Sequence, residues 1–304
     1  MNFVILDLEW NASYSKKDKR FYNEIIEYGA VKTDENLNII DTFSMLIKPQ
    51  IGKKLNSRIK ELTHITNEEL ETSHNTFQKV SACFEEFLGD AVLLTWGTSD
   101  IHALMENYGY YNKDSRPSFL KYYCDLQLYC EFALDKHDKG KQMGLSTCAE
   151  LLNIDSDELT LHRALTDAEL SLLCFKKLYD GEKIKKYIRK CDDEFYRKIT
   201  FRTCYITDIN NPLIDKSEMN FDCPKCNHKA KRKTKWTVKN RSFRANFLCE
   251  NCGHEFMGRI VYKLRYEGLK VNKRAIPIPP PKEKEEVSHE VKSNKDYVTT
   301  RESQ

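Results

Sequence analysis

The sequence lacks the patterns that would place the protein in a membrane or outside the cell. No run of apolar residues approaches the ~20 that a membrane-spanning helix needs. The opening residues show no secretory pattern, because Asp7 and Glu9 interrupt the first apolar run and no basic stretch precedes it. The 11 cysteines are odd in number and irregular in spacing, which argues against a disulfide framework and for a reducing compartment. We therefore expect a soluble cytoplasmic protein.

Internal repeats are absent as well, and 304 residues with a 40% hydrophobic content suffice for about two domains. The overall charge of +3 conceals a strong asymmetry. Residues 1–180 hold 20 Lys and Arg against 29 Asp and Glu, a net charge of −9, whereas residues 221–274 hold 15 against 4, a net charge of +11. An acidic part followed by a basic part is typical of an enzyme that acts on nucleic acid. The alternative for the basic part is an ordinary solvated surface.

Strands alternate with helices along residues 1–180, which predicts an α/β domain with a sheet covered on both sides. The polar residues 11–20 are expected to form a loop. Continuous apolar or β-branched runs predict strands over residues 2–10, 25–32, 39–47 and 91–96. Apolar periodicity and cap signals predict helices from Thr66, with Glu69 completing a capping box, and over residues 76–88, 101–108, 126–134, 145–152 and 161–179.

The rest of the chain is expected to contain a connector, a small module and a tail. Residues 181–220 form the connector, in which 182–198 can continue as a charged helix. Residues 221–274 form the cysteine-containing module described below. Residues 275–304 are proline-rich and then highly charged, so they hold too few apolar residues to offset the entropy of ordering and are expected to be disordered.

Four carboxylates and one histidine are the candidate catalytic residues: Asp7, Glu9, Asp100, His162 and Asp167. Asp7 and Glu9 share one face of the first strand, because strand side chains alternate. A phosphodiester repels hydroxide, and two Mg²⁺ ions about 3.5–4 Å apart can neutralise it, generate hydroxide and stabilise the leaving 3′ oxygen. Carboxylate oxygens suit Mg²⁺, and a histidine with a near-neutral pKa can deprotonate the attacking water.

Each of these signals is weak when it is taken alone. An Asp-x-Glu is usually polar surface, and an Asp after a strand is often a helix cap. Asp7 is harder to dismiss, since an acid inside an apolar strand costs free energy to bury unless it has a partner. The ordered combination is therefore much more specific than any one member.

Taken in order, the motifs resemble the DEDDh exonucleases, and most closely their Eri-type, KapD-like branch, over roughly residues 1–180. The segments that carry the resemblance are Leu6–Trp10, Glu24–Val31, Leu62–Thr66, Thr95–Asp100 and His162–Ala168. The resemblance implies a ribonuclease-H-like mixed sheet flanked by helices, and 3′-to-5′ exonuclease activity with two Mg²⁺ or Mn²⁺ ions. It also implies that Asp7, Glu9, Asp100 and Asp167 bind the metals and that His162 is the general base.

Two departures from the family pattern bear on substrate preference. His64 stands where relatives often have Gly, and Thr98 and Ser99 replace the more typical pair before the third acid. Trp10 and Trp96 could stack on the terminal base or sugar of a substrate. Ordinary core packing is an equally good explanation of both tryptophans.

Cys223, Cys226, Cys249 and Cys252 form two Cys-x-x-Cys pairs with 22 residues between them. Each pair can bind one side of a tetrahedral Zn²⁺, so the module over residues 221–274 is predicted to be a β-rich zinc ribbon. Four thiolates leave no open position for chemistry, so the predicted Zn²⁺ is structural. A redox function would need a βαβ context, and the sequence shows none here.

Cations and aromatic residues between the cysteine pairs are candidates for binding nucleic acid, because cations contact phosphates and aromatic rings stack on unpaired bases. The alternative is that the aromatic residues form the core of the ribbon and that the ribbon docks a protein. The candidate substrate-binding residues here are Lys231, Arg232, Lys233, Trp236, Arg241 and Arg244.

The sequence thus favours a metal-dependent 3′-to-5′ exonuclease that acts on single-stranded nucleic acid. RNA is favoured over DNA only through the family branch. Two alternatives remain open: an exonuclease that trims DNA, and a non-catalytic nucleic-acid-binding regulator of the sporulation-inhibitor kind. The complete set of five candidate residues argues against the regulator.

Overall fold

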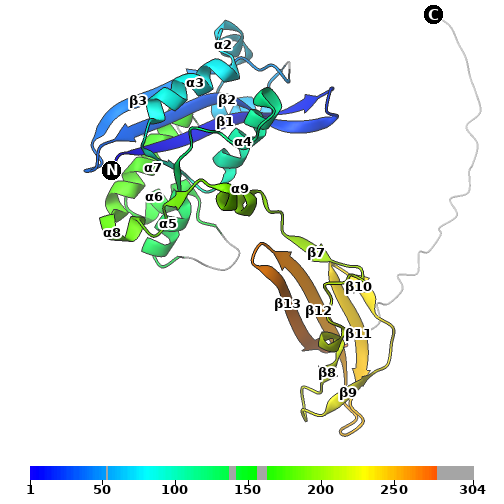
Figure 1. Ribbon diagram of the computed structural model, residues 1–304. Coiled ribbons are helices and arrows are strands. Elements are labelled where there is room, and N and C mark those ends of the chain that lie inside the picture. The colour runs from blue at the N-terminus through cyan, green and yellow to red at the C-terminus, as the bar shows by residue number, and fades with distance from the viewer. Residues whose placement is uncertain (53, 137–141, 156–162, 279–304) are drawn as a thin grey trace, which may run out of the picture. The chain divides into compact units, whose positions relative to one another are not determined.

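The computed structural model describes residues 1–52, 54–136, 142–155 and 163–278 (Figure 1). The chain divides into two compact units, Met1–Phe201 and Arg202–Gln304, which are treated separately below. Within the described residues no helix is both long and apolar enough to cross a membrane.

The first unit is built on one mixed six-stranded sheet. The strand order is β3-β2-β1-β4-β5-β6, in which β1 pairs antiparallel with β2 and parallel with β4. Because β1 lies in the middle of the sheet, its side chains are covered on both faces. The strands are β1 (Phe3–Ser15), β2 (Arg20–Thr33), β3 (Ile39–Leu46), β4 (Val92–Thr95), β5 (Tyr122–Asp125) and β6 (Arg189–Lys190).

Helices cover both faces of this sheet, as the sequence predicts for an α/β domain (Figure 1). Leu6 and Leu8 of β1 pack in a core with α3 and α4, whereas Phe3 and Ile5 pack in a second core with α5, α6 and α7. The helices are α1 (Ser57–Thr63), α2 (Asn67–Thr72), α3 (Phe77–Leu88), α4 (Ser99–Asn112), α5 (Leu126–Ala133), α6 (Leu145–Leu151), α7 (Ala164–Leu178), α8 (Gly181–Ile184) and α9 (Asp193–Thr200).

Two sequence-based expectations about this unit are wrong in detail. Residues 11–20 do not form a loop throughout, because β1 and β2 stay paired as far as Ser15 and Arg20. Residues 182–198 do not form one continuous helix. They are divided into α8, the short edge strand β6 and the start of α9, since Arg189 pairs with Tyr123 of β5 and interrupts the helix.

The structure divides the expected connector between the two units. The ring of Tyr196 in α9 is buried in the core beneath α3 and α4, so the first unit extends to residue 201. β7 (Cys204–Ile206) instead pairs with β12 in the second unit.

The second unit is a β-rich module of antiparallel strands. Its core contains the buried rings of Phe221, Phe243, Phe247 and Phe256. A long hairpin of β12 and β13 follows the second cysteine pair and was not apparent from the sequence pattern. Besides β7, the strands are β8 (Phe221–Asp222), β9 (Lys229–Arg232), β10 (Thr237–Lys239), β11 (Ser242–Leu248), β12 (Glu255–Arg265) and β13 (Gly268–Ile276), and η1 (Lys216–Met219) is a 3₁₀ helix.

Candidate active site and cysteine cluster

Three carboxylates from two distant segments meet on one face of the sheet. Asp7 and Glu9 lie on β1, and they share its odd-numbered face with Phe3 and Ile5, which pack in the core with α7. Asp167 lies in the first turn of α7. One oxygen from each carboxylate can be chosen so that all three atoms lie within 4.8 Å of one another. The structure therefore brings these three predicted metal ligands together.

Asp100 reaches the same region from another element. It lies in the first turn of α4, directly after β4, and its side chain is buried. Its Oδ1 accepts a hydrogen bond of 3.1 Å from the backbone N–H of Leu8, which lies between Asp7 and Glu9. Asp100 is not a member of the three-carboxylate group, so its position suits a ligand or orienting group at the edge of the site.

Crowding and burial make these acids hard to ionise together. Burial raises the pKa of Asp7 well above its usual range, and the charges of Asp100, Glu9 and Asp167 raise it further. Burial also raises the pKa of Glu9 to about 8, with Asp167 the largest of the neighbouring charges. For Asp100, burial outweighs the hydrogen bond from Leu8 and raises the pKa to about 7. An all-oxygen donor set with this excess of negative potential fits hard divalent cations such as Mg²⁺.

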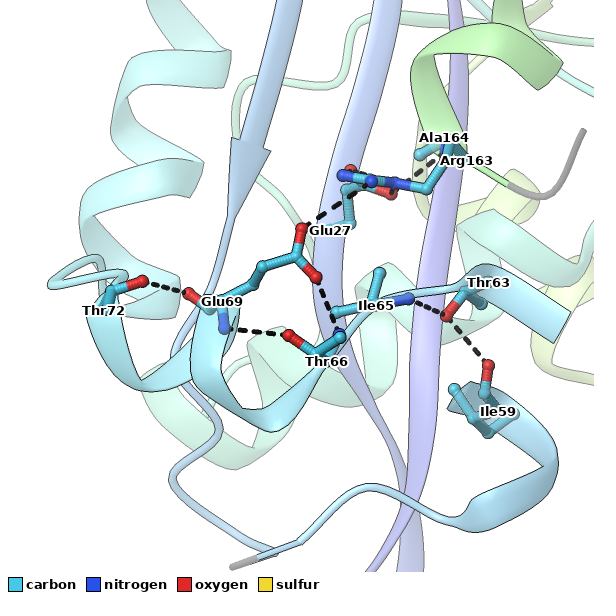
Figure 2. A network of polar contacts seen from close by, with 9 residues as sticks. All are labelled: Glu27, Ile59, Thr63, Ile65, Thr66, Glu69, Thr72, Arg163 and Ala164. Atoms are coloured by element: carbon cyan, nitrogen blue, oxygen red, sulfur yellow. Dashed lines mark hydrogen bonds and ion pairs between the residues drawn. The ribbon is translucent and has the colours of Figure 1, made fainter. Parts of the chain in front are cut away.

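A buried ion pair anchors the start of α7, and sequence reasoning did not identify it (Figure 2). Glu27 of β2 is only 1% exposed and lies opposite Glu9 in the strand register. Both nitrogens Nε and Nη2 of Arg163 donate to Oε1 of Glu27, at 3.1 and 2.6 Å. The backbone N–H of Ala164 donates to Oε2 at 3.2 Å. Because Arg163 is the N-cap residue of α7, the pair fixes the helix that carries Asp167.

A glycine lets the same helix approach the sheet closely. Gly29 of β2 lies opposite Asp7, and a Cβ atom added to it would lie 2.0 Å from the backbone of Ala164 and Leu165. Only a residue without a side chain fits at this distance. The close approach brings the first turn of α7, and with it Asp167, next to β1.

The short helices α1 and α2 add a second contact to Arg163. Thr66 and Glu69 form the capping box that the sequence predicts for α2, and Oε1 of Glu69 lies 3.9 Å from Nη1 of Arg163 (Figure 2). Between the two helices His64 has φ 58°, in the left-handed region. Gly adopts this conformation without strain, so His64 stands at a position that favours Gly.

The remaining candidates of the first unit differ in their surroundings. His162 falls outside the described residues, in the segment just before Arg163. Trp10 is half-buried against the core beneath α3 and α4. Trp96 is packed against the other core, and its indole N–H donates to the carbonyl of Met143 at 3.3 Å. Packing therefore accounts for the position of Trp96 without a ligand.

The four predicted zinc ligands form one cluster in the second unit. The sulfur atoms of Cys223, Cys226, Cys249 and Cys252 all lie within 4.8 Å of one another. The sulfur of Cys226 lies 3.3 Å from that of Cys252 and 3.4 Å from that of Cys249, and the sulfur atoms of Cys223 and Cys252 are 3.6 Å apart. A tetrahedral Zn²⁺ with Zn–S bonds of about 2.3 Å needs sulfur atoms about 3.8 Å apart, so the cluster is compatible with such an ion.

The two Cys-x-x-Cys turns have the same backbone design. The N–H of Asn227 donates to the carbonyl of Cys223, and the N–H of Gly253 donates to that of Cys249, at 2.9 and 2.8 Å. Asn227 and Gly253 both have positive φ, 60° and 68°, which Asn and Gly tolerate best. This symmetry directs each pair of thiols toward a common centre.

The candidate nucleic-acid residues of the second unit are spread over several strands. Arg232 lies over the ring of Trp236 at 6.0 Å, and both line a cavity of about 480 Å³ that also includes Lys216. Lys231 and Lys233 pair at the surface with Glu250 and Glu255. The other two cations make local contacts: Arg241 lies 5.1 Å above the ring of Tyr205, and Arg244 donates to the hydroxyl of Ser242.

A ribonuclease-H-like sheet with clustered carboxylates on its central strand defines the class of the first unit: it has the fold of the DEDDh exonucleases. The family model described as Exonuclease, of the RNase T type, matches residues 4–175. The chain therefore belongs to this exonuclease family.

Individual relatives agree with this assignment. Over 200 residues the chain is 29% identical to the Probable 3′-5′ exonuclease KapD of Bacillus subtilis (strain 168), covering 62% of this chain and 88% of the relative. The nuclease domain of 3′hExo, a DEDDh family member bound to rAMP, matches with 23% identity and a TM-score of 0.51 over 63% of this chain and 96% of that domain. A 3′-exonuclease that recognises the histone mRNA stem-loop matches with 20% identity and a TM-score of 0.52, over 64% and 91% of the two chains.

Proposed function

We propose that the protein is a metal-dependent 3′-to-5′ exonuclease that hydrolyses phosphodiester bonds at the 3′ end of single-stranded nucleic acid, preferably RNA. The observation that carries the proposal is the group of Asp7, Glu9 and Asp167, whose oxygens lie within 4.8 Å of one another in a chain of the exonuclease family. The names of the relatives support the polarity and the substrate: a 3′-5′ exonuclease, and 3′-exonucleases in complexes named for rAMP and histone mRNA.

The positions of the acids support a proposed role for each. Asp7, Glu9 and Asp167 would hold one Mg²⁺ or Mn²⁺, and Asp7 and Asp100 would help to hold or orient a second. When bound, two such ions neutralise the phosphate, promote ionisation of water and stabilise the leaving 3′ oxygen. The Glu27–Arg163 pair supports the position of Asp167, since Arg163 is the N-cap residue of the helix that carries Asp167 and Glu27 also accepts from the N–H of Ala164.

His162 is proposed as the general base, which accepts the proton of the attacking water. It directly precedes Arg163 in the sequence, and Arg163 pairs with Glu27, which lies opposite Glu9 in the strand register. A histidine with an ordinary pKa is partly neutral at physiological pH and can act in this way.

We also propose that the cysteine cluster binds one structural Zn²⁺ and that the second unit contacts the substrate. The spacing of the sulfur atoms supports the zinc, and the second unit needs it because a module of this size has a small core. The cavity lined by Lys216, Arg232 and Trp236 combines cations with an aromatic ring, a chemistry that suits a phosphate and an unpaired base.

The test is degradation of 5′-labelled RNA and DNA single strands in the presence of Mg²⁺ or Mn²⁺. We expect a ladder that shortens from the 3′ end, more rapidly on RNA, and a loss of at least about 10³-fold for Asp7→Asn, since that change removes a charged metal ligand. Asp41→Asn is the matched control, because Asp41 is an exposed acid on β3. A wild-type protein that degrades neither strand with either metal would contradict the proposal, and faster cleavage of DNA would contradict the preference for RNA.

A further inference from the structure

The far ends of β1 and β2 form a two-stranded ribbon that continues past the other strands of the sheet (Figure 1). β4 pairs with β1 only as far as Leu6, and β3 pairs with β2 only from Glu27 onward. In the described sheet, β1 and β2 beyond those points pair with each other alone, to the end of the ladder at Ser15 and Arg20. We call residues 14–21 the ribbon tip.

The ribbon is supported from one side by α4, the helix that carries Asp100. The side chain of Asn107 accepts from the N–H of Ile25 at 3.2 Å and donates to the carbonyl of Asn23 at 2.7 Å. The ring of Tyr22 packs against Tyr110 with centroids 4.9 Å apart. An isolated two-stranded hairpin is marginally stable in water, so these contacts hold the ribbon in a fixed position relative to the acids.

The ribbon tip exposes two aromatic rings. Tyr14 and Phe21 are cross-strand partners, 46% and 67% exposed, with ring centroids 5.1 Å apart. Phe21 is thus the more exposed of two large rings that no core covers. Strand alternation places Tyr14 on the same face as Ala12 and Trp10, which is the opposite face of β1 from Asp7 and Glu9, so a bound strand that contacts both the acids and these rings must pass around the edge of the two-stranded ribbon.

The same tip is strongly basic within an acidic unit. Residues 16–20 have a net charge of +3, whereas residues 1–180 as a whole have −9. The one acid, Asp18, accepts hydrogen bonds from the hydroxyls of Ser15 and Tyr22 inside the turn. The exposed cations of the turn are Lys16, Lys17, Lys19 and Arg20.

We propose that the ribbon tip is a second binding site for single-stranded nucleic acid, which contacts the strand several nucleotides upstream of the 3′ end. The inference rests on the proposed exonuclease function. Tyr14 lies five residues beyond Glu9, or ~17 Å along an extended strand. A stacked strand rises ~3.4 Å per nucleotide, so this distance corresponds to about five nucleotides. The exposed rings stack on unpaired bases, and the lysines contact the phosphates between them.

The test compares a 20-nucleotide strand with a trinucleotide that is too short to reach the tip. For the double variant Tyr14→Ala/Phe21→Ala we expect KM for the 20-mer to rise at least about fivefold, with kcat/KM for the trinucleotide unchanged. The triple variant Lys16→Ala/Lys17→Ala/Lys19→Ala should also weaken 20-mer binding. It should reduce the slope of log affinity against log salt concentration by about 2, at ~0.7 per phosphate contact.

Matched controls come from the same unit. Tyr122→Ala/Phe132→Ala removes two similarly exposed rings, and Lys176→Ala/Lys177→Ala/Lys186→Ala removes three exposed lysines near the other end of the unit. Both controls should match the wild type. Tip variants that bind and degrade the 20-mer normally would show that the tip is only a solvated turn, and equal losses on both substrates would show an indirect effect on the site.

Binding of a labelled 20-mer in Ca²⁺, measured by fluorescence anisotropy, separates this proposal from the proposed activity. If the wild type binds in Ca²⁺ but does not cleave in Mg²⁺ or Mn²⁺, the exonuclease proposal fails. Weaker binding by the tip variants would still support the ribbon site. If the tip variants bind nucleic acid normally, the proposed ribbon site is wrong, even if the tip is found to bind a protein.

Discussion

At the scale of single residues, the site depends on how Arg163 is shared between two acids. Glu27 is buried and accepts from two nitrogens of the guanidinium, whereas Glu69 is half-buried and its Oε1 lies 3.9 Å from Nη1. Glu27 also adds to the negative potential that raises the pKa of Glu9. The charge of Glu27 therefore helps to fix the position of α7, but it also makes the neighbouring acids harder to ionise.

Glu27→Gln should destabilise the protein by about 2 kcal/mol, less than for a fully buried pair because 31% of the Arg163 side chain is exposed. We expect a lower Tm and a kcat lowered at least about tenfold, because Asp167 loses its fixed position. Glu69→Gln is the control, since it keeps the capping box and removes a weak contact worth at most about 1 kcal/mol. Tighter metal binding with an unchanged Tm would show that the electrostatic effect of Glu27 outweighs its positioning effect.

The pKa values of the acids predict how divalent ions change stability with pH. Burial raises the pKa of Glu9 from 4.5 to about 8 and that of Asp100 from 3.8 to about 7. A raised carboxyl pKa stabilises the fold below the unfolded value, and that stabilisation is lost as pH rises through the folded value. In EDTA the Tm should therefore fall between pH 5 and pH 8.

The measurement is thermal unfolding at both pH values with EDTA or Mg²⁺. Mg²⁺ should raise the Tm more at pH 8 than at pH 5, because the ionised acids bind it. Asp7→Asn should weaken both the pH dependence and the response to Mg²⁺, since it removes one charge from the cluster. An equal response to Mg²⁺ at the two pH values would contradict this account.

The sequence alone predicted the three acids that the structure brings together, because Asp7, Glu9 and Asp167 occur in a recognisable order. It did not predict the partner of Arg163. A signal was available, since Glu27 interrupts an apolar strand in the same way as Asp7, and a buried acid needs a partner. Which of the many cations supplies that partner depends on the packing of α7 on β2, and no local pattern encodes it.

At the scale of elements, the packing of α7 on β2 decides whether the acids can meet. Gly29→Ala would place a methyl group 2.0 Å from the backbone of Ala164 and Leu165, so the helix must move. We expect a loss of several kcal/mol in stability, or a similar loss of activity if the fold survives. Urea unfolding measures the loss of stability, and a degradation assay measures the loss of activity.

Gly109→Ala in α4 is the control, because the added methyl group meets only ordinary contacts with Ser115 at 3.4 Å. In a helix, Ala is more stable than Gly by about 0.5–1 kcal/mol, so this variant should be at least as stable as the wild type. A Gly29→Ala protein with normal stability and activity would show that α7 has room to shift.

Elements that depend on local pattern were predicted well, and those that depend on distant contacts were not. The apolar core of β1 and the capping box at Thr66 are encoded locally, and the structure confirms them. The outer ends of β1 and β2 are polar and resemble a loop, yet the two strands stay paired there, and Asn107 of α4 bonds to Asn23 and Ile25 of β2. The helix expected over residues 182–198 is interrupted because Arg189 pairs with β5.

At the scale of the whole molecule, the two units are stabilised by different means. The first has two apolar cores around one sheet, whereas the second has one small core and the cysteine cluster. We therefore expect the two units to differ in their sensitivity to metal removal. A chelator selective for Zn²⁺ should abolish one unfolding transition and leave the transition of the first unit unchanged.

Cys226→Ser should mimic the chelator, because it removes one of four thiolates. Cys204→Ser is the control, since Cys204 is an exposed cysteine of the same unit outside the cluster. Calorimetry and the zinc content of the purified protein measure the effect. Equal zinc content in both variants would contradict the assignment of the cluster.

The central position of β1 also determines when the nuclease can first work. β1 is synthesised before the other strands of its sheet, its parallel partner β4 follows about 90 residues later, and Asp167 follows Asp7 by 160 residues. At the usual rate of ~5–20 residues per second, translation takes roughly 10–30 s to supply the last of the three acids. If the three acids act as proposed, a growing chain has no activity until most of the first unit has been synthesised, so the order of the strands along the chain sets a delay before activity.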